Sequence, residues 1–218
     1  VSSVPGLEHK DDLESLAASA KAGGFSDLAI LPNTQPTIQT RDAVQYLKSQ
    51  SDRLGVNFHP IAALTKDVQG EQMTEILDLH HSGAVAFSDG LHSTRSTGTM
   101  MLALQYLQTI NGLLIQFPDD TSVSGNGQMH EGITSTRMGM KGIPALAEEI
   151  AIMKDLALLR YTGGRIHFSN ISTAQSVETI RQAKAEGLQV TADVAAFQVY
   201  FTDMNMMVFD TNMKVKPP

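Results

Sequence analysis

The chain has no cysteine among its 218 residues. This absence excludes disulfide bonds, thiolate metal sites and a cysteine nucleophile, and it fits the reducing cytoplasm, where we expect the protein to act. Charged residues are also few, at 18%, and the acidic ones dominate to give a formal net charge of -7. Because no cluster of lysine and arginine offsets that charge locally, we expect no nucleic-acid partner.

Long apolar runs and low-complexity tracts are missing as well. No run approaches the roughly 18 residues of a membrane span, and residues 1–6 lack the charged and apolar regions of a signal peptide. Hydrophobic residues still make up 42% of the chain, enough for one sizeable core. The sequence therefore predicts a soluble globular protein with no membrane partner.

Six short apolar runs typical of β-strands alternate with longer segments of helical period. This alternation favours a parallel sheet with crossover helices. The predicted strands cover residues 28–31, 58–62, 84–87, 113–117, 165–168 and 189–193.

Helices are predicted between these strands from the i, i+3, i+4 spacing of apolar residues. One stripe begins at Leu13 and stops at Gly23, another spans 143–162, and a third, capped by Ser172 or Thr173, ends before Gly187. Residues 120–142 show no period and are long for a simple connection, and loops of that length are usually functional or mobile.

Six β/α units in register fit either a (β/α)₈ barrel or a doubly wound sheet. No linker divides the chain, so residues 1–218 are expected to form one domain. A barrel would need two more strands than the chain supplies, and its domain would then be truncated at both ends. We expect the six strands to be parallel and in chain order, with an open sheet edge or another chain covering it.

Eight motifs, in the same order along the chain, resemble those of bacterial dihydroorotases. The most specific is Pro-Asn-Thr-x-Pro at 32–36. The motifs lie at residues 5–12, 22–25, 31–36, 83–89, 130–132, 142–149, 172–174 and 210–218.

This resemblance implies an incomplete TIM-type (β/α)₈ barrel of the amidohydrolase superfamily, comprising about strands 2 to 7. In that family, zinc at the C-terminal mouth of the barrel serves the closure of carbamoyl aspartate to dihydroorotate in pyrimidine synthesis. Such chemistry needs metal ions that lower the pKa of bound water, and a carboxylate that carries the proton.

The positions that match the family's metal ligands are replaced in this sequence. Val1, Phe117 and Asn170 stand where the family has histidines, and only Asn170 retains a donor atom, a poor one for zinc. Ser3 matches the arginine that binds substrate carboxylate, and the family's eighth-strand aspartate would follow Pro218. The resemblance therefore implies no intact metal site and no catalytic residue.

Two matching positions are kept. Asp89 corresponds to a carboxylate that joins the metals in part of the family, although Asp89-Gly90 stands where the family often has Asp-Asp-Gly. A polar residue at a strand end equally well caps a loop or a helix, and we favour that role. Asn33 corresponds to a substrate-carboxylate ligand, but Pro-Asn-Thr is also turn chemistry in which the amide bonds local backbone.

The remaining histidines and the methionines offer no clear replacement site. His80 and His81 suit a helix C-terminus, and His167 fits a hydrogen-bonded polar position in the core. No His-x-His or H-E-x-x-H pattern occurs. The methionines at 204, 206, 207 and 213 favour adaptable packing, with a mobile binding surface as the alternative.

Two functions follow as hypotheses. The first is an inactive dihydroorotase-like protein kept as a scaffold or subunit. It would associate with itself or with aspartate transcarbamoylase, with which inactive members of the family assemble. The alternative is an active cyclic amidohydrolase, a dihydroorotase or a hydantoinase-like enzyme, with an altered site. The barrel fold alone does not separate them.

Overall fold

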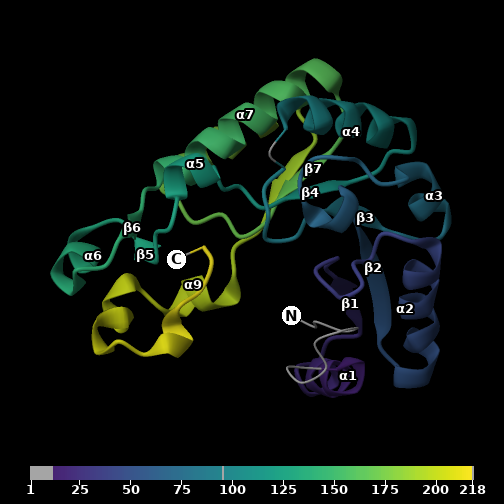
Figure 1. The fold of residues 1–218 in the computed structure, drawn as a ribbon, viewed down its shortest axis with the longest axis horizontal. Coiled ribbons are helices and arrows are strands. Elements are labelled where there is room, and N and C mark those ends of the chain that lie inside the picture. Colours follow the sequence, from purple (N-terminus) through teal and green to yellow (C-terminus); the bar gives the residue numbers. More distant parts are fainter. Residues whose placement is uncertain (1–11, 95, 218) are drawn as a thin grey trace. The chain divides into compact units, whose positions relative to one another are not determined.

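The computed structural model describes residues 12–94 and 96–217, and the predictions for Val1 and Ser3 concern residues outside these ranges. All six predicted strands are found, in one sheet ordered β1-β2-β3-β4-β7-β8, and every pairing described between them is parallel; β1, β2, β3, β4 and β7 are labelled in Figure 1. Chain order and direction are confirmed. The strands are β1 (Asp27–Ile30), β2 (Asn57–Ala63), β3 (Ala86–Ser88), β4 (Leu114–Gln116), β7 (Ile166–Phe168) and β8 (Val190–Ala192).

The central strands are buried on both faces, which explains why they read as continuous apolar runs in the sequence. In β2 the last four residues are buried, and β3 is buried throughout. Parallel strands covered by crossover helices show this pattern, whereas half-exposed strands alternate between apolar and polar residues.

The crossover helices begin and end at the residue types that the sequence offers for caps. Asp12, Thr40, Ser96 and Thr173 each accept a hydrogen bond from a backbone N–H in the first turn of the helix that follows. The helices are α1 (Leu13–Ala22), α2 (Arg41–Leu54), α3 (Ile76–His81), α4 (Thr97–Thr109), α7 (Leu146–Thr162) and α8 (Ala174–Ala185), with a 3₁₀ turn η1 (Lys66–Val68) after β2.

The chain divides into two compact units. The first comprises the residues up to Gln116 together with Thr162–Arg165, and the second comprises Phe117–Tyr161 and Ile166–Pro218. Within the described residues, no helix is long and apolar enough to cross a membrane. The expectation of a single domain stays a prediction.

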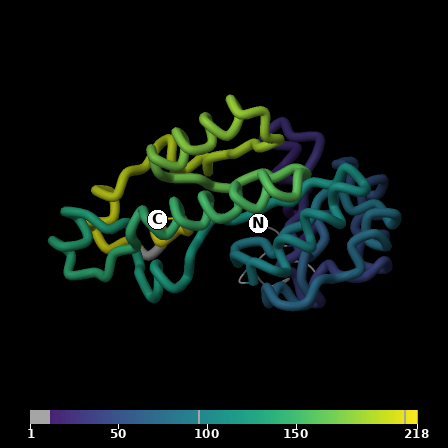
Figure 2. Tube along the Cα trace, turned by 90° about the horizontal axis from the view of Figure 1, so that it is seen from above, coloured from purple at the N-terminus to yellow at the C-terminus, as the bar shows by residue number. Residues whose placement is uncertain are grey.

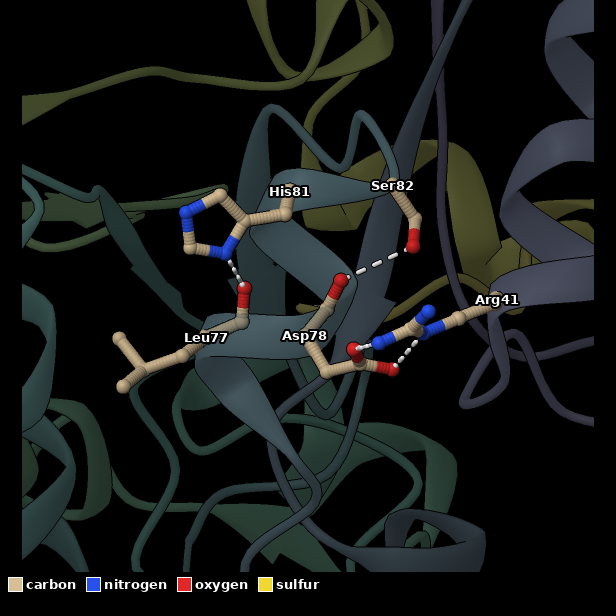
Figure 3. Close-up of polar contacts among 5 residues, drawn as sticks. All are labelled: Arg41, Leu77, Asp78, His81 and Ser82. Atoms are coloured by element: carbon tan, nitrogen blue, oxygen red, sulfur yellow. Dashed lines mark hydrogen bonds and ion pairs between the residues drawn. The ribbon is translucent and has the colours of Figure 1, made fainter.

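Polar contacts at the surface of the first unit tie α2 to α3 (Figure 3). Arg41, at the start of α2, forms a two-pronged ion pair with Asp78 of α3. At the end of α3, the Nδ1 atom of His81 lies 2.6 Å from the carbonyl oxygen of Leu77, and Ser82 Oγ donates to the carbonyl of Asp78. His81 therefore has the helix-terminal role expected of it.

In the second unit, α7 and α8 lie side by side (Figure 2), joined where Arg160 donates two hydrogen bonds to Glu186 at 2.7 and 3.0 Å. The segment 120–142, expected to be a loop, folds into short elements. A two-residue strand gives no readable period, which is why the sequence does not reveal them. These elements are α5 (Thr121–Ser124), β5 (Met129–His130), α6 (Ile133–Met138) and β6 (Gly142–Ile143), with β5 and β6 paired in parallel.

The C-terminal part of the second unit consists of α9 (Ala196–Tyr200), η2 (Asp203–Val208) and η3 (Thr211–Met213). The packing role predicted for its methionines is wrong for two of them, because Met204 is 58% exposed and Met207 is 43% exposed. Short 3₁₀ turns leave too few inward-facing positions to bury so many large side chains.

Candidate functional site

Asp89 follows the carboxyl end of β3 and is fully buried. Its Oδ1 accepts a hydrogen bond from Thr65 N at 2.8 Å, and its Oδ2 accepts one from Thr65 Oγ1 at 2.7 Å. The Thr65 hydroxyl in turn accepts from Gly70 N at 2.8 Å. The Asp89 carboxylate thus stabilises the loop that follows β2, and both of its oxygens accept hydrogen bonds within the first unit.

Burial raises the pKa of the Asp89 carboxyl above its ordinary value of 3.8, and the hydrogen bonds from Thr65 offset part of that rise. A buried carboxylate whose hydrogen bonds come from neutral donors is costly to ionise. We find no cationic side chain bonded to it among the described residues.

Asn33 lies directly against Gly90. An ideal Cβ atom added to residue 90 would come within 1.6 Å of Asn33 Oδ1, so only glycine leaves room for this amide. Asn33 Oδ1 is buried and accepts no hydrogen bond from the described residues. The Asn33 oxygen therefore takes no part in the local backbone bonding expected of this amide, and the N–H of Thr34 donates to the Pro32 carbonyl at 2.8 Å within the same turn.

Substituting Gly90 by alanine should lower the free energy of unfolding by about 2–4 kcal/mol, because the new Cβ displaces Asn33 and the backbone has φ +66°. Gly187→Ala is the matched control, since Gly187 has φ +87° with nothing within 4 Å, so that only the backbone cost of about 1 kcal/mol applies. Urea denaturation measures both. Equal losses in the two variants would mean that Asn33 moves aside without cost.

Phe117 directly follows β4 in the chain and is buried, at 2% exposure. The Nζ atom of Lys216 lies 5.2 Å from the centroid of its ring, within the range of a cation–π contact. The same Nζ forms an ion pair with Oδ2 of Asp119 at 2.7 Å. Asp119 is 7% exposed, so this ammonium is held over the aromatic ring by a buried carboxylate.

A cavity opens beside Phe117 within the second unit, and its lining includes His130, Glu148, Ser172 and Lys216. Glu148 is buried, and its two oxygens accept hydrogen bonds from the backbone N–H and the hydroxyl of both Ser172 and Thr173, at 2.6 to 3.1 Å. These bonds hold the Glu148 carboxylate to the residues that begin α8.

Asn170 follows β7 with a left-handed backbone, φ 57°. Its N–H donates to Asp193 Oδ1 at 2.6 Å. The other oxygen of Asp193 lies 3.0 Å from His167 Nε2, and His167 Nδ1 lies 2.8 Å from Thr191 Oγ1. These contacts link the ends of β7 and β8. His167 is therefore a hydrogen-bonded strand residue, as the sequence suggests.

The residues at the matched positions do not fit zinc. Phe117 offers no donor, and the Lys216 ammonium beside it would repel a metal cation. Asp89 is one carboxylate, and each of its oxygens already accepts a hydrogen bond from Thr65. Across residues 12–94 and 96–217, no group of three His, Cys, Asp or Glu side chains could hold a metal ion, whereas catalytic zinc usually takes three protein ligands.

Three residues of this region were missed by reasoning from the sequence: Asp119, Glu148 and Lys216. Glu148 and Lys216 lie in motifs that served only to establish the resemblance, Ala147-Glu-Glu149 and Lys214-Val-Lys-Pro-Pro218. Nothing in the sequence around Lys216, which two prolines follow, indicates that its side chain lies over the ring of Phe117.

Comparison with known proteins supports the resemblance. Residues 3–176 match the family described as "Dihydro-orotase-like". Similar curated proteins include dihydroorotase from Pelotomaculum thermopropionicum, 40% identical over 214 residues, and dihydroorotase from Caldanaerobacter subterraneus, 40% identical over 215 residues. Each alignment covers 98% of this chain but 50% of the relative, so the chain spans about half the length of these relatives.

Solved structures show the same fold. An L-hydantoinase from Arthrobacter aurescens superimposes with a TM-score of 0.79 at 23% identity, covering 95% of this chain and 48% of that one. Dihydroorotase from Saccharomyces cerevisiae, in complex with 5-fluoroorotic acid, gives a TM-score of 0.66 at 18% identity, covering 89% and 55%. The predicted incomplete amidohydrolase barrel is confirmed. The chain belongs to the dihydroorotase-like family.

Proposed function

We propose that this chain is a catalytically inactive dihydroorotase-like protein with a scaffold or subunit role in cytoplasmic pyrimidine biosynthesis. The observation that carries the proposal is the Lys216 ammonium, held by Asp119 over the ring of Phe117. It puts a positive side chain beside the position that the resemblance assigns to a histidine ligand.

The chemistry of the family explains why this replacement matters. Without a metal ion, the pKa of a bound water is not lowered to about 7, so hydroxide is scarce at neutral pH. The nearby carboxylates already have partners within the protein, since Asp119 pairs with Lys216 and Glu148 accepts hydrogen bonds from Ser172 and Thr173.

Zinc content and turnover of carbamoyl aspartate test the proposal. The purified chain is expected to hold no stoichiometric zinc and to show no turnover above background, with a dihydroorotase relative assayed in parallel as the positive control. Phe117→His alone should not restore activity, because Asn170 and Lys216 remain. Stoichiometric zinc together with turnover that Asp89→Asn abolishes in a folded variant would instead favour the active cyclic amidohydrolase, a dihydroorotase or a hydantoinase-like enzyme.

The scaffold role requires a partner, and the family suggests aspartate transcarbamoylase or a second copy of the chain. Light scattering on the purified chain distinguishes monomer from self-association. Co-purification from the native cell tests the larger complex, and recovery of monomer alone in both experiments would contradict the scaffold role.

A further inference from the structure

Two asparagines of the chain directly precede a glycine, Asn111 and Asn126. Glycine has no Cβ to obstruct its own backbone nitrogen, so this nitrogen can attack the side-chain carbonyl carbon of the preceding asparagine. The attack closes a five-membered succinimide ring and releases the side-chain nitrogen as ammonia. Water then opens the ring at either carbonyl, which leaves aspartate or isoaspartate in place of asparagine. The two sites differ in how far the fold permits this reaction.

Asn111 is held in a closed turn at the end of α4, within the first unit. Its backbone is left-handed, with φ 51°. Its N–H donates to the Gln108 carbonyl at 3.2 Å, and the N–H of Gly112 donates to the Leu107 carbonyl at 2.8 Å. This pair of bonds is the Schellman motif that commonly ends a helix. Arg165 also donates to the Asn111 carbonyl, at 3.3 Å. Gly112 is buried as well, so its nitrogen can attack Asn111 only if the turn opens.

Asn126 lies in a less restrained turn of the second unit, between α5 and β5 (Figure 1). It is exposed, and within the described ranges no hydrogen bond of its side chain is found. Gly125 has φ 51° and ψ −130°, as in the first central position of a type II′ turn. The bond that closes the turn runs from the Gly127 N–H to the Ser124 carbonyl at 3.1 Å, at the end of a helix of four residues. So short a helix gives the turn little protection against opening.

We propose that Asn126 is a site of spontaneous deamidation in the folded protein, whereas the Schellman motif protects Asn111. The reaction consumes only water. A bond forms between the Gly127 nitrogen and Cγ of Asn126, the bond from Cγ to Nδ2 breaks, and the proton lost by the Gly127 nitrogen leaves with Nδ2 as ammonia. Hydrolysis of the succinimide then adds the oxygen of the new carboxylate. This inference does not depend on whether the chain is catalytically inactive.

The two products should affect the pairing of β5 with β6 differently. Aspartate leaves the backbone unchanged, and its charge has a cation nearby, since Lys141 Nζ lies 3.4 Å from the position of a Cβ on Gly125. Isoaspartate carries the main chain through its own side-chain carbon, which lengthens the chain by one atom and displaces Gly127. Gly127 has no room to move toward β6, because a Cβ on it would lie 2.8 Å from the carbonyl oxygen of Gly142.

The pairing of β5 with β6 also shapes the cavity beside Phe117. His130 lies opposite Ile143 in that pairing, and both residues line the cavity. Formation of isoaspartate at position 126 should therefore loosen one wall of the cavity, whereas aspartate should leave this wall as it is.

Peptide mapping of the aged 218-residue chain by mass spectrometry tests the proposal. The chain is incubated at mildly alkaline pH, either folded in buffer or unfolded in urea, and chromatography separates the aspartyl and isoaspartyl peptides. In the folded chain we expect Asn126 to react at least about tenfold faster than Asn111, because the hydrogen-bonded turn at Asn111 must first open. In urea the two rates should be similar, since a glycine follows both asparagines.

Substitutions separate the two sites and the two products. Asn126→Ser should remove most of the ammonia that the folded chain releases, whereas Asn111→Gly, which suits the left-handed backbone, should leave the release unchanged. Asn126→Asp supplies the aspartyl product alone and should unfold at the same urea concentration as the fresh parent chain. The aged parent chain should unfold at a lower urea concentration, and the aged Asn126→Ser variant should not.

Equal rates at Asn111 and Asn126 in the folded chain would overturn the proposal. Reaction of Asn126 in urea but not in the folded chain would also overturn it, because the bond from Gly127 to Ser124 would then be shown to protect the site. An aged parent chain that unfolds like the aged Asn126→Ser variant would refute the effect of isoaspartate on β5 and β6.

Discussion

Glu148→Ala is expected to lower the free energy of unfolding by about 3–5 kcal/mol, the largest loss that any single substitution considered for this chain should produce. The buried carboxylate accepts hydrogen bonds from the N–H groups and hydroxyls of Ser172 and Thr173. Alanine leaves these donors without their acceptor at the point where the chain enters α8, whose N-cap is Thr173. Urea denaturation followed by circular dichroism measures the loss.

Two further variants show whether the effect comes from this network. Glu148→Gln keeps one carbonyl oxygen as an acceptor and should lose about half as much. Glu149→Ala removes the neighbouring carboxylate, which has no hydrogen bond or ion pair among the described residues, and should change stability by less than about 0.5 kcal/mol. If Glu149→Ala lowered the free energy of unfolding as much as Glu148→Ala, the loss would come from removing a negative charge from the helix and not from the hydrogen bonds to Ser172 and Thr173.

The order of the strands could be predicted from the sequence because the central strands are buried on both faces. Pro60–Ala63 and Ala84–Phe87 appear as continuous apolar runs, and parallel pairing leaves little choice of topology once helices alternate with strands. The ends of the helices were also readable, since Thr173 and Gly23 are residues whose chemistry favours a helix boundary.

The short strands β5 and β6 could not be predicted in the same way. Each has two residues, which pair Met129 with Gly142 and His130 with Ile143. Local propensity gives no signal over so short a stretch.

For the candidate site, the sequence revealed only which of the family's ligand residues are replaced. The sequence shows that Phe117 and Asn170 stand where the family has ligands, but not what the structure puts beside them. The Asp119–Lys216 pair joins residues far apart in the chain, and its geometry depends on tertiary packing. Likewise, the commitment of Asp89 to Thr65 follows from the loop after β2, whose path the sequence does not specify.

Asp89→Ala is expected to lower the free energy of unfolding by about 2–4 kcal/mol at neutral pH, with or without added zinc. The substitution removes the acceptor of the Thr65 N–H and of its hydroxyl, both of them buried, and each unsatisfied group costs about 1–3 kcal/mol. If Asp89 were instead a metal ligand, zinc would stabilise the parent chain and not the variant. Thermal unfolding in zinc and in chelator distinguishes the two.

The Asp89→Asn variant should show a pH dependence whose sign follows from the raised pKa of this carboxyl. Because the folded state then holds the proton more tightly than the unfolded state, the part of the stability that comes from the raised pKa is complete below the ordinary pKa of 3.8 and is lost as the pH rises through the folded-state pKa, while the hydrogen bonds to Thr65 remain. Asparagine does not titrate, so the stability of Asp89→Asn relative to the parent chain should improve as the pH rises from about 4. A difference that stays constant between pH 4 and neutrality would show that Asp89 ionises in the folded protein as easily as in the unfolded one, and its role would then lie in its hydrogen bonds alone.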